Sequence, residues 1–201
     1  MRGVIFFLLI FAFQSAEACD NYASWKVKDT DCAWTKSAEA SVLAVDLASL
    51  SPSDVSGFCP KYETLPRLDK ARFWVALISA ISRPESNYKT MQQYKESFLD
   101  SKGDPVISRG LLQISMESAN QSRYSCGIAN EKDLHDPFVN IQCGVKILNY
   151  WVKKDGAIAT YGNGSPKGGG RYWSVLREKN NHLVELKENT SGMSFCKKNI
   201  K

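Results

Sequence analysis

Hydrophobic residues between Ala71 and Tyr88 follow the period of a helix and predict one that is buried on all sides. The helical repeat is made by Phe73, Ala76, Leu77, Ala80 and Ile81, and the other faces are made apolar by Trp74, Val75 and Ile78. Pro84 disfavours the helical conformation of the residue before it. We therefore expect the helix to stop or kink at Arg83 and to leave Glu85 just beyond its end.

Glu85 is the residue that such a helix would present. The negative end of the helix dipole and carbonyl groups without partners gather at a helix C-terminus. A carboxyl that is partly desolvated there keeps its proton to a higher pH than a free one, although Arg83 would oppose the shift if it pointed inward. A glutamate that is protonated at neutral pH can act as a general acid. The alternative is that Glu85 merely follows the helix at the surface.

Helical patterns also dominate the rest of the chain, and no convincing series of alternating strands is present. Residues 35–50 can form one amphipathic helix. Asp136 and Pro137 are an N-cap and a first helical residue, and an apolar stripe continues towards Gly156, which ends this second helix. Residues 171–187 are helical in character. These patterns predict a mainly α fold with a central buried helix.

The segments between the predicted helices carry fewer signals. Residues 87–104 could form a short helix or an irregular loop that lines a cleft. Residues 106–115 read as a buried segment in which Gln113 is the one polar side chain of an apolar run, and Ser115 could cap a helix that continues through Gln121. The glycine-rich residues 162–170 lack the P-loop motif, so we expect a mobile loop at the edge of a cleft.

The first residues indicate export. Arg2 precedes an apolar run over residues 4–13, and residues 16–18 match a cleavage site, which predicts a signal peptide over residues 1–18. Neither this run nor a later segment has the roughly 20 apolar residues of a spanning helix, so we expect no stable membrane insertion. The protein would be secreted or periplasmic, although acylation of Cys19 would give a lipid-anchored form. Residues 19–58 would be an N-terminal extension packed on a main domain over residues 59–201.

Six cysteines follow the predicted cleavage site: Cys19, Cys32, Cys59, Cys126, Cys143 and Cys196. An even number in an exported chain predicts up to three disulfides, and of the 15 possible pairings we expect Cys126 with Cys143. The wide spacing of the cysteines and the presence of only His135 and His182 argue against a metal site. We expect neither a metal nor a cofactor.

The charge of the chain narrows the class of partner. The 201 residues carry 26 Lys and Arg against 21 Asp and Glu, which gives a net charge of +5. This excess is spread along the chain without a dense basic run or an interleaved aromatic platform, so nucleic acid is not the expected partner. The net charge fits a protein that works on an anionic polymer such as a bacterial cell wall. We expect this protein to be a monomer.

Four motifs stand in one order between residues 65 and 177. They are Pro84–Glu85–Ser86, then Gly110–Leu111–Leu112–Gln113–Ile114, then Asp136–Pro137 with Asn140–Ile141 and Gly144, and then Ala159–Thr160–Tyr161–Gly162–Asn163–Gly164. Together they resemble the catalytic domain of the soluble lytic transglycosylases (SLT), in the lysozyme-like superfamily that includes goose-type lysozyme. The resemblance implies a lysozyme-like helical domain and cleavage of the β-1,4 bond between N-acetylmuramic acid and N-acetylglucosamine in the glycan strands of peptidoglycan.

The resemblance also implies roles for individual residues. Glu85 matches the catalytic glutamate, Gln113 the glutamine that lines the sugar site, and Tyr161 the tyrosine that hydrogen-bonds near that glutamate. Ser108 and Asn163 are further candidates for substrate binding, at positions where the chain departs from the family pattern. The departures are Ile107–Ser108 for Gly-Ala, Leu112 for Met, and Gly162–Asn163–Gly164 for Asn-Ala-Gly.

Three modes of action remain open at this point. We expect the single-glutamate mechanism of lytic transglycosylases, in which Glu85 acts first as acid and then as base and leaves a 1,6-anhydro product. Hydrolysis usually needs two carboxyl groups, and Asp100 or Asp104 would supply the second in a lysozyme-type enzyme. A non-catalytic, wall-binding protein of the same fold is the third interpretation, and the intact Glu85 and Tyr161 count against it.

Overall fold

The computed structural model describes residues 22–162, 164–177 and 181–197 and is mainly helical. Its α-helices are α1 (Ala33–Ala44), α2 (Arg67–Ser86), α3 (Met116–Ala119), α4 (Pro137–Asp155) and α5 (His182–Ser191). An antiparallel sheet is formed, in this order, by β1 (Gln93–Leu99), β2 (Pro105–Arg109) and β3 (Ile114–Ser115), and a separate hairpin by β4 (Tyr161–Gly162) and β5 (Ser165–Pro166). Short 3-10 helices cover Ser24–Val27, Leu47–Ser49, Val55–Gly57, Tyr62–Thr64, Glu131–His135, Gly168–Arg171 and Ser174–Leu176. The predicted signal peptide and Cys19 lie outside the described residues.

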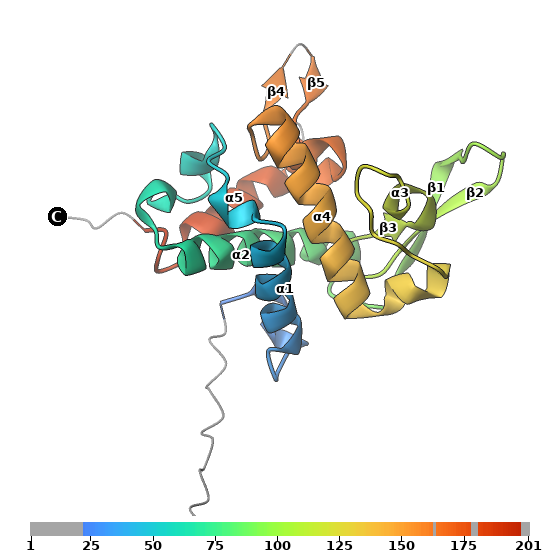
Figure 1. Cartoon of the computed structure of the whole chain (residues 1–201), viewed down its shortest axis with the longest axis horizontal. Coiled ribbons are helices and arrows are strands. Elements are labelled where there is room, and N and C mark those ends of the chain that lie inside the picture. Colours follow the sequence, from blue (N-terminus) through green and yellow to red (C-terminus); the bar gives the residue numbers. More distant parts are fainter. Residues whose placement is uncertain (1–21, 163, 178–180, 198–201) are drawn as a thin grey trace, which may run out of the picture.

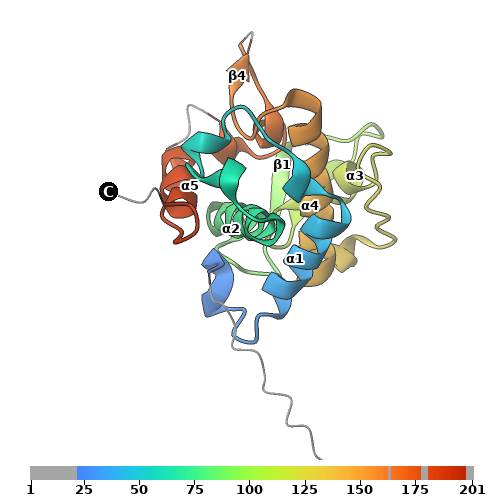
Figure 2. The ribbon, with the colours of Figure 1, turned by 60° about the vertical axis from the view of Figure 1, so that its left-hand side comes forward.

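Helix α2 lies in the middle of the molecule, with α1, α4 and α5 packed around it (Figures 1 and 2). Every residue from Phe73 to Ser82 is buried, as the hydrophobic period predicted. A fully buried aliphatic or aromatic side chain contributes about 1.5–3 kcal/mol relative to an exposed one, so this helix carries much of the core. Its C-terminal end points towards the sheet (Figure 1), and the chain passes from there through Asn87 into β1.

The helix does not stop at Pro84, so the expectation that it ends at Arg83 and leaves Glu85 beyond its end was wrong. It continues to Ser86, and Asn87 then caps it in the left-handed region (φ 51°), where its N–H donates to the carbonyl of Arg83 (2.8 Å). A proline in the last turn removes one backbone hydrogen bond, and burial of the preceding turns outweighs that loss. Glu85 therefore lies within the last turn of α2, still at the negative end of its dipole.

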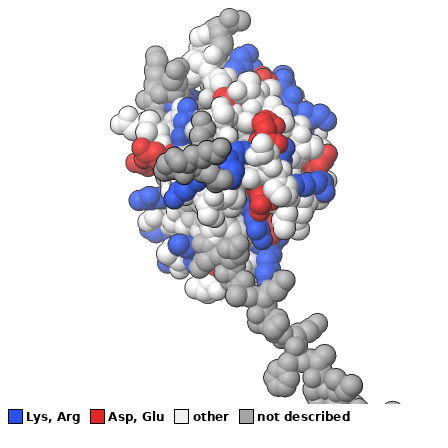
Figure 3. Space-filling model, turned by 90° about the vertical axis from the view of Figure 1, so that its left-hand side faces the viewer, with Lys and Arg blue, Asp and Glu red and all other residues white. Residues whose placement is uncertain are grey.

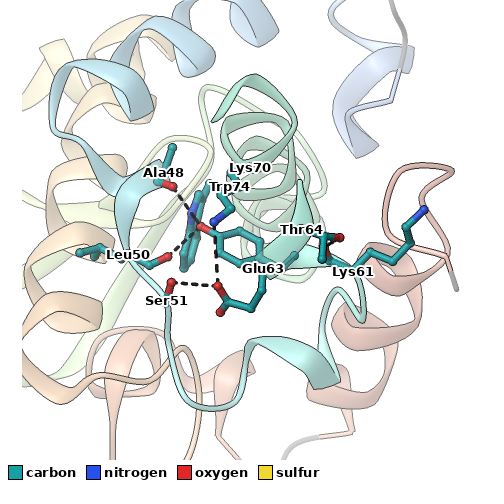
Figure 4. A network of polar contacts seen from close by, with 9 residues as sticks. Ala48, Leu50, Ser51, Lys61, Glu63, Thr64, Lys70 and Trp74 are labelled. Carbon is teal, nitrogen blue, oxygen red and sulfur yellow. Dashed lines mark hydrogen bonds and ion pairs between the residues drawn. The ribbon is translucent and has the colours of Figure 1, made fainter. Parts of the chain in front are cut away.

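The segment before α2 is fixed to that helix by a buried tyrosine. The Nε1 of Trp74 donates to the Oη of Tyr62 (2.8 Å), which in turn donates to the carbonyl of Leu50 (2.9 Å). Beside them the carboxylate of Glu63 lies 3.9 Å from the Nζ of Lys70 (Figure 4). These contacts join residues 50–63 to the buried face of α2.

Residues 87–104 contain β1 and the turn of the β1–β2 hairpin instead of the predicted helix or loop. The three-stranded sheet corrects the expectation that the fold lacks a series of strands. In β1 every side chain is exposed except that of Glu96, which is half-buried. A strand without an apolar face shows no hydrophobic alternation, which is why the sequence pattern did not reveal it. At the tip of the hairpin the Asp100 carboxylate accepts the backbone N–H groups of Lys102 and Asp104 (2.8 Å each).

Two of the predicted helix ends are confirmed and one is displaced. Helix α4 begins after the Asp136 cap and ends at Gly156 (φ 63°), as predicted. Ser115 caps α3, because its Oγ accepts the backbone N–H of Ser118 (3.2 Å). That helix ends at Ala119 instead of Gln121.

Two other predicted helices and the glycine-rich loop are built differently. Helix α1 ends at Ala44, and the turn Leu47–Ser49 stands apart from it because Asp46 takes a left-handed conformation (φ 58°). In place of one helix over residues 171–187, two 3-10 helices precede α5. Residues 162–170 contribute to the β4–β5 hairpin and to a 3-10 helix, and Asn163 lies outside the described residues.

Two disulfides join described residues. Cys126 pairs with Cys143, as predicted, and Cys59 pairs with Cys196. The second bond ties the chain that follows α5 to the chain that precedes α2. Cys32 is disulfide-bonded as well.

Charged side chains of both signs are intermingled on the face of the molecule that lies away from the sheet (Figure 3). The excess of basic residues is therefore not gathered into one dense patch on this face. Among the helices of the described ranges, none is long and apolar enough to cross a membrane.

The turn over residues 110–113, between β2 and β3, is held by hydrogen bonds from three elements. The Oγ of Ser86, at the end of α2, donates to the carbonyl of Leu111 (2.9 Å). The Nε1 of Trp173 donates to the carbonyl of Leu112 (3.0 Å). The side chain of Asn140, in α4, accepts the N–H of Leu112 (2.9 Å) and donates to two further backbone carbonyls (2.9 and 3.0 Å). This turn is thereby fixed relative to the end of α2.

Gly110 and Gly144 are required because the turn approaches α4 closely. Gly110 has φ 74°, and a Cβ there would lie 2.2 Å from the carbonyl oxygen of Leu134. A Cβ at Gly144 would lie 2.2 Å from the Cδ1 of Leu112. Both glycines and Asn140 belong to the motifs that carry the family resemblance, and their role here is to pack the turn onto α4.

Replacing Asn140 tests how much the fold depends on this turn. Asn140→Ala should lower the free energy of unfolding by at least about 2 kcal/mol, because each buried backbone group left without a partner costs about 1–3 kcal/mol. Urea unfolding measures the change. Gln142→Ala, at an exposed position of the same helix, is the control and should alter stability by less than about 0.5 kcal/mol. Equal stability of Asn140→Ala and wild type would contradict the described hydrogen bonding.

Candidate active site

The carboxyl of Glu85 is held in a poorly solvated position at the end of α2. Burial, and to a smaller extent the negative charge of Glu96, raises the pKa of Glu85 from an ordinary value of 4.5 to about 7. Arg83 is exposed and does not oppose this rise. The carboxyl group of Glu85 forms no hydrogen bond or ion pair with any residue in the described part of the chain. Its carboxyl therefore holds a proton near neutral pH, as the sequence predicted, and that proton is available for donation.

Glu96, on β1, is the second carboxylate near this position. The hydroxyl of Ser108, a buried residue on β2, donates to the Oε1 of Glu96 (2.5 Å). The β1–β2 register pairs Tyr94 with Ser108, which places Glu96 and Ser108 on the same face of the sheet. Glu96 was missed because no strand was predicted. The alternation Tyr94, Glu96, Phe98 is the one signal that could have oriented it.

Asp100 and Asp104, the second acids predicted for hydrolysis, are used differently. Asp100 accepts backbone N–H groups in the hairpin turn, and these bonds, the one from Asp104 first, hold its pKa below the ordinary value. Neither aspartate contributes to the raised pKa of Glu85, whereas Glu96 does. The prediction that Asp100 or Asp104 partners Glu85 is therefore corrected, and Glu96 is the carboxylate beside it.

Gln113 lies in the turn over residues 110–113, where its backbone is left-handed (φ 48°). Its Nε2 donates to the carbonyls of Gly110 (2.8 Å) and Gln92 (3.3 Å). Its Oε1 is buried without a hydrogen-bond partner among the described residues. A buried acceptor in this state is costly, and a hydroxyl or N–H group of a bound molecule would satisfy it. The geometry fits the sugar-binding role predicted for Gln113.

Tyr161, which the sequence predicted for the site, and Tyr172 differ in their surroundings. The side chain of Tyr161, on β4, is 36% exposed and forms no hydrogen bond or ring contact with any other described residue. Tyr172 lies near enough to Glu85 to be influenced by its charge. Burial raises the pKa of its hydroxyl, and the Glu85 carboxylate adds a smaller contribution. No motif pointed to Tyr172 in the sequence. The structure thus brings Glu85, Glu96, Ser108 and Tyr172 into one neighbourhood.

These groups define what the site can do chemically. Glu85 can donate a proton, a carboxylate at Glu96 can offset developing positive charge, and Gln113 can accept a hydrogen bond from a ligand. Within residues 22–162, 164–177 and 181–197, no group of three or more His, Cys, Asp or Glu side chains could hold a metal ion.

Comparisons with known proteins give the family. Residues 66–180 match the family described as Transglycosylase SLT domain. Among solved structures, wild-type Bd0314 DslA (form 2) has a TM-score of 0.82 and 42% sequence identity, over 87% of this chain and 97% of that chain. Two DslA mutants, each with one glutamate replaced by glutamine, have TM-scores of 0.82 and 0.80 at 41% and 43% identity, over 87% and 86% of this chain and 97% and 94% of theirs. A comparison with curated proteins found no match.

The family match covers more than half of the 201 residues, and the likeness to DslA extends over most of both chains. The fold class predicted from the sequence, a mainly helical lysozyme-like domain, is confirmed. The chain belongs to the transglycosylase SLT domain family, whose members are lytic transglycosylases that act on peptidoglycan.

Proposed function

We propose that this protein is an exported enzyme that cleaves the β-1,4 bond between N-acetylmuramic acid and N-acetylglucosamine, with Glu85 as its general acid. The observation that carries the proposal is the Glu85 carboxyl, which has a pKa of about 7 and no hydrogen-bond partner in the described chain. A group of this kind suits proton donation to a leaving oxygen near neutral pH. Gln113, Ser108, Tyr161 and Asn163 would bind the glycan strand.

The single-glutamate mechanism consumes no water. Glu85 gives its proton to the glycosidic oxygen while the bond from that oxygen to the anomeric carbon breaks. The Glu85 carboxylate then takes the proton of the muramoyl 6-hydroxyl, whose oxygen bonds to the anomeric carbon. The products are a 1,6-anhydro end and a free 4-hydroxyl, and Glu85 is protonated again. Glu96 would raise the pKa of Glu85 and offset the positive charge of the oxocarbenium-like transition state.

A hydrolase that uses both glutamates is the second candidate, and the position of Glu96 favours it. The two DslA mutants replace glutamates that are eleven positions apart, and the same interval separates Glu85 from Glu96. In this scheme Glu96 either takes a proton from the attacking water or first bonds to the anomeric carbon. The product then carries a reducing end in place of an anhydro end.

Glu85→Gln keeps the size of the side chain and removes its titrating proton. Peptidoglycan cleavage should therefore fall by about 10²–10⁴-fold. In the wild type, cleavage should decline as pH rises above about 7, where Glu85 loses its proton. Turbidity clearance of purified peptidoglycan measures both effects. Glu188→Gln, the same change at an exposed position of α5, is the matched control. A folded Glu85→Gln protein that clears peptidoglycan at the wild-type rate would contradict the proposal.

The raised pKa of Glu85 also predicts how stability depends on pH. The folded pKa of about 7 exceeds the ordinary value of 4.5, so protonation of Glu85 favours the folded state. This contribution is complete below pH 4.5 and is lost as pH rises through 7. As pH rises between these limits, the free energy of unfolding of the wild type should decrease relative to that of Glu85→Gln, which has no titrating group at this position. Paired urea melts measure it, and a constant difference would show that Glu85 titrates normally.

Glu96→Gln separates the two mechanisms. In the single-glutamate scheme anhydro ends persist, and the upper pH limit of activity moves to lower pH, because loss of a nearby negative charge lowers the pKa of Glu85. In the hydrolase scheme the formation of reducing ends is lost. Mass spectrometry of muropeptides distinguishes the products, and Asp104→Asn should leave them unchanged. A wild type that forms only reducing ends would exclude the single-glutamate scheme.

The proposal of export is supported by the sequence of residues 1–18 and by the disulfides, which form in oxidising compartments. Intact-mass analysis of the secreted protein should place its N-terminus near Cys19 and show the loss of hydrogen that disulfides entail. Size-exclusion chromatography of the same sample should give a monomer. An uncleaved chain with six free thiols would argue against export.

A further inference from the structure

Two residues that precede the family match hold the chain that leads into β4. One carboxylate oxygen of Asp54 accepts the backbone N–H of Ile158 (2.7 Å), and the other accepts that of Ala159 (2.8 Å). The N–H and the hydroxyl of Ser53 both donate to the carbonyl of Gly156 (2.8 and 3.1 Å). The match to the SLT domain begins only at residue 66. These contacts therefore come from the predicted N-terminal extension.

The segment that Asp54 holds is continuous with the β4–β5 hairpin. Two backbone hydrogen bonds join the chain before this hairpin to the chain after it. The carbonyl of Thr160 accepts the N–H of Lys167 (2.8 Å), and the carbonyl of Ile158 accepts the N–H of Gly169 (2.7 Å). Ile158 is fully buried. The direction in which β4 leaves the core is thus set by the peptide groups at residues 158–160, two of which donate to Asp54.

Tyr161 depends on this backbone for its placement. Its side chain is 36% exposed and has no hydrogen bond or ring contact with another described residue, so neither kind of contact fixes it. Ala159 is two positions before Tyr161. Hydrogen bonds from two N–H groups to one ionised carboxylate are short and directional, and they restrict the orientation of the peptide groups that donate them.

We propose that Asp54 is a positioning residue for Tyr161, and that the N-terminal extension thereby completes one wall of the substrate-binding site. The inference rests on the proposed function, since it takes Tyr161 to contact the glycan. It gives residues 53–54 a part in activity although they lie outside the matched domain and 104 positions before Ile158.

Asp54→Asn tests this role, because the amide keeps the shape of the side chain and replaces one acceptor oxygen by an NH₂ group that cannot accept. The kcat/KM for soluble peptidoglycan fragments should fall about ten- to a hundredfold, the loss expected for a hydrogen bond to a charged group that is felt in the transition state. Asp46→Asn is the matched control in the same extension. Its exposed carboxylate pairs with Arg67 (2.9 Å), and kcat/KM should stay within about twofold of wild type.

Introducing Asp54→Asn into a Tyr161→Phe protein distinguishes a positioning role of Asp54 from a general loss of structure. If Asp54 acts through Tyr161, then Asp54→Asn should lower the kcat/KM of a Tyr161→Phe protein by less than about threefold, because the hydroxyl that it positions is already absent. Losses that multiply fully in the double variant would overturn the proposal. So would an Asp54→Asn protein with wild-type kcat/KM.

Thermal melts accompany the assays, and each variant is assayed below its melting temperature. If Asp54→Asn does not fold, Ser53→Ala takes its place in both backgrounds, with a smaller fall expected and the same outcomes decisive. This change removes only the hydroxyl contact to Gly156. An inactive wild type would contradict the proposed function itself, whereas an active wild type with unchanged variants removes only the role of Asp54.

Discussion

Burial of α2 on every side between Phe73 and Ser82 is the constraint on which the rest of this structure depends. The last turn of α2 follows directly from this buried stretch. Glu85 is therefore half-buried at the edge of the core and is desolvated there, whereas Arg83 in the same turn is exposed. The free energy that raises the pKa of Glu85 is therefore drawn from the fold as a whole. A loosely packed α2 would let water reach the carboxyl and lower its pKa.

Most residues of the family motifs support the site and do not react. Ser86 and Asn140 bond to the backbone of the turn over residues 110–113, while Gly110 and Gly144 make room for its approach to α4. Among the described motif residues, the carboxyl of Glu85, the Oε1 of Gln113 and the hydroxyl of Tyr161 form no hydrogen bond with the described chain. The motifs therefore specify a rigid frame that fixes the relative position of one acid and one hydrogen-bond acceptor.

What could be predicted from the sequence is what is encoded locally. The hydrophobic period gave α2, and a cap followed by proline and a closing glycine gave both ends of α4. Strand β1 has no apolar face, so no hydrophobic period marked the strand, and the orientation of Glu96 was left to the alternation of Tyr94, Glu96 and Phe98 alone. The hydrogen bond from the N–H of Ile158 to Asp54 spans 104 positions, and no local pattern records a contact of that range.

The bond between Cys59 and Cys196 turns the part of the chain that carries the site into a covalent ring. Helix α2, the sheet, α4 and the β4–β5 hairpin all lie inside this ring. A protease that cuts the backbone once, at any position within it, opens the ring without releasing a fragment, because both pieces stay joined through the two sulfur atoms. Glu85 and Gln113 become separable only after a second cut or after reduction. In a compartment that contains proteases, the first cut thus opens the ring but leaves the residues of the site in one covalently joined molecule.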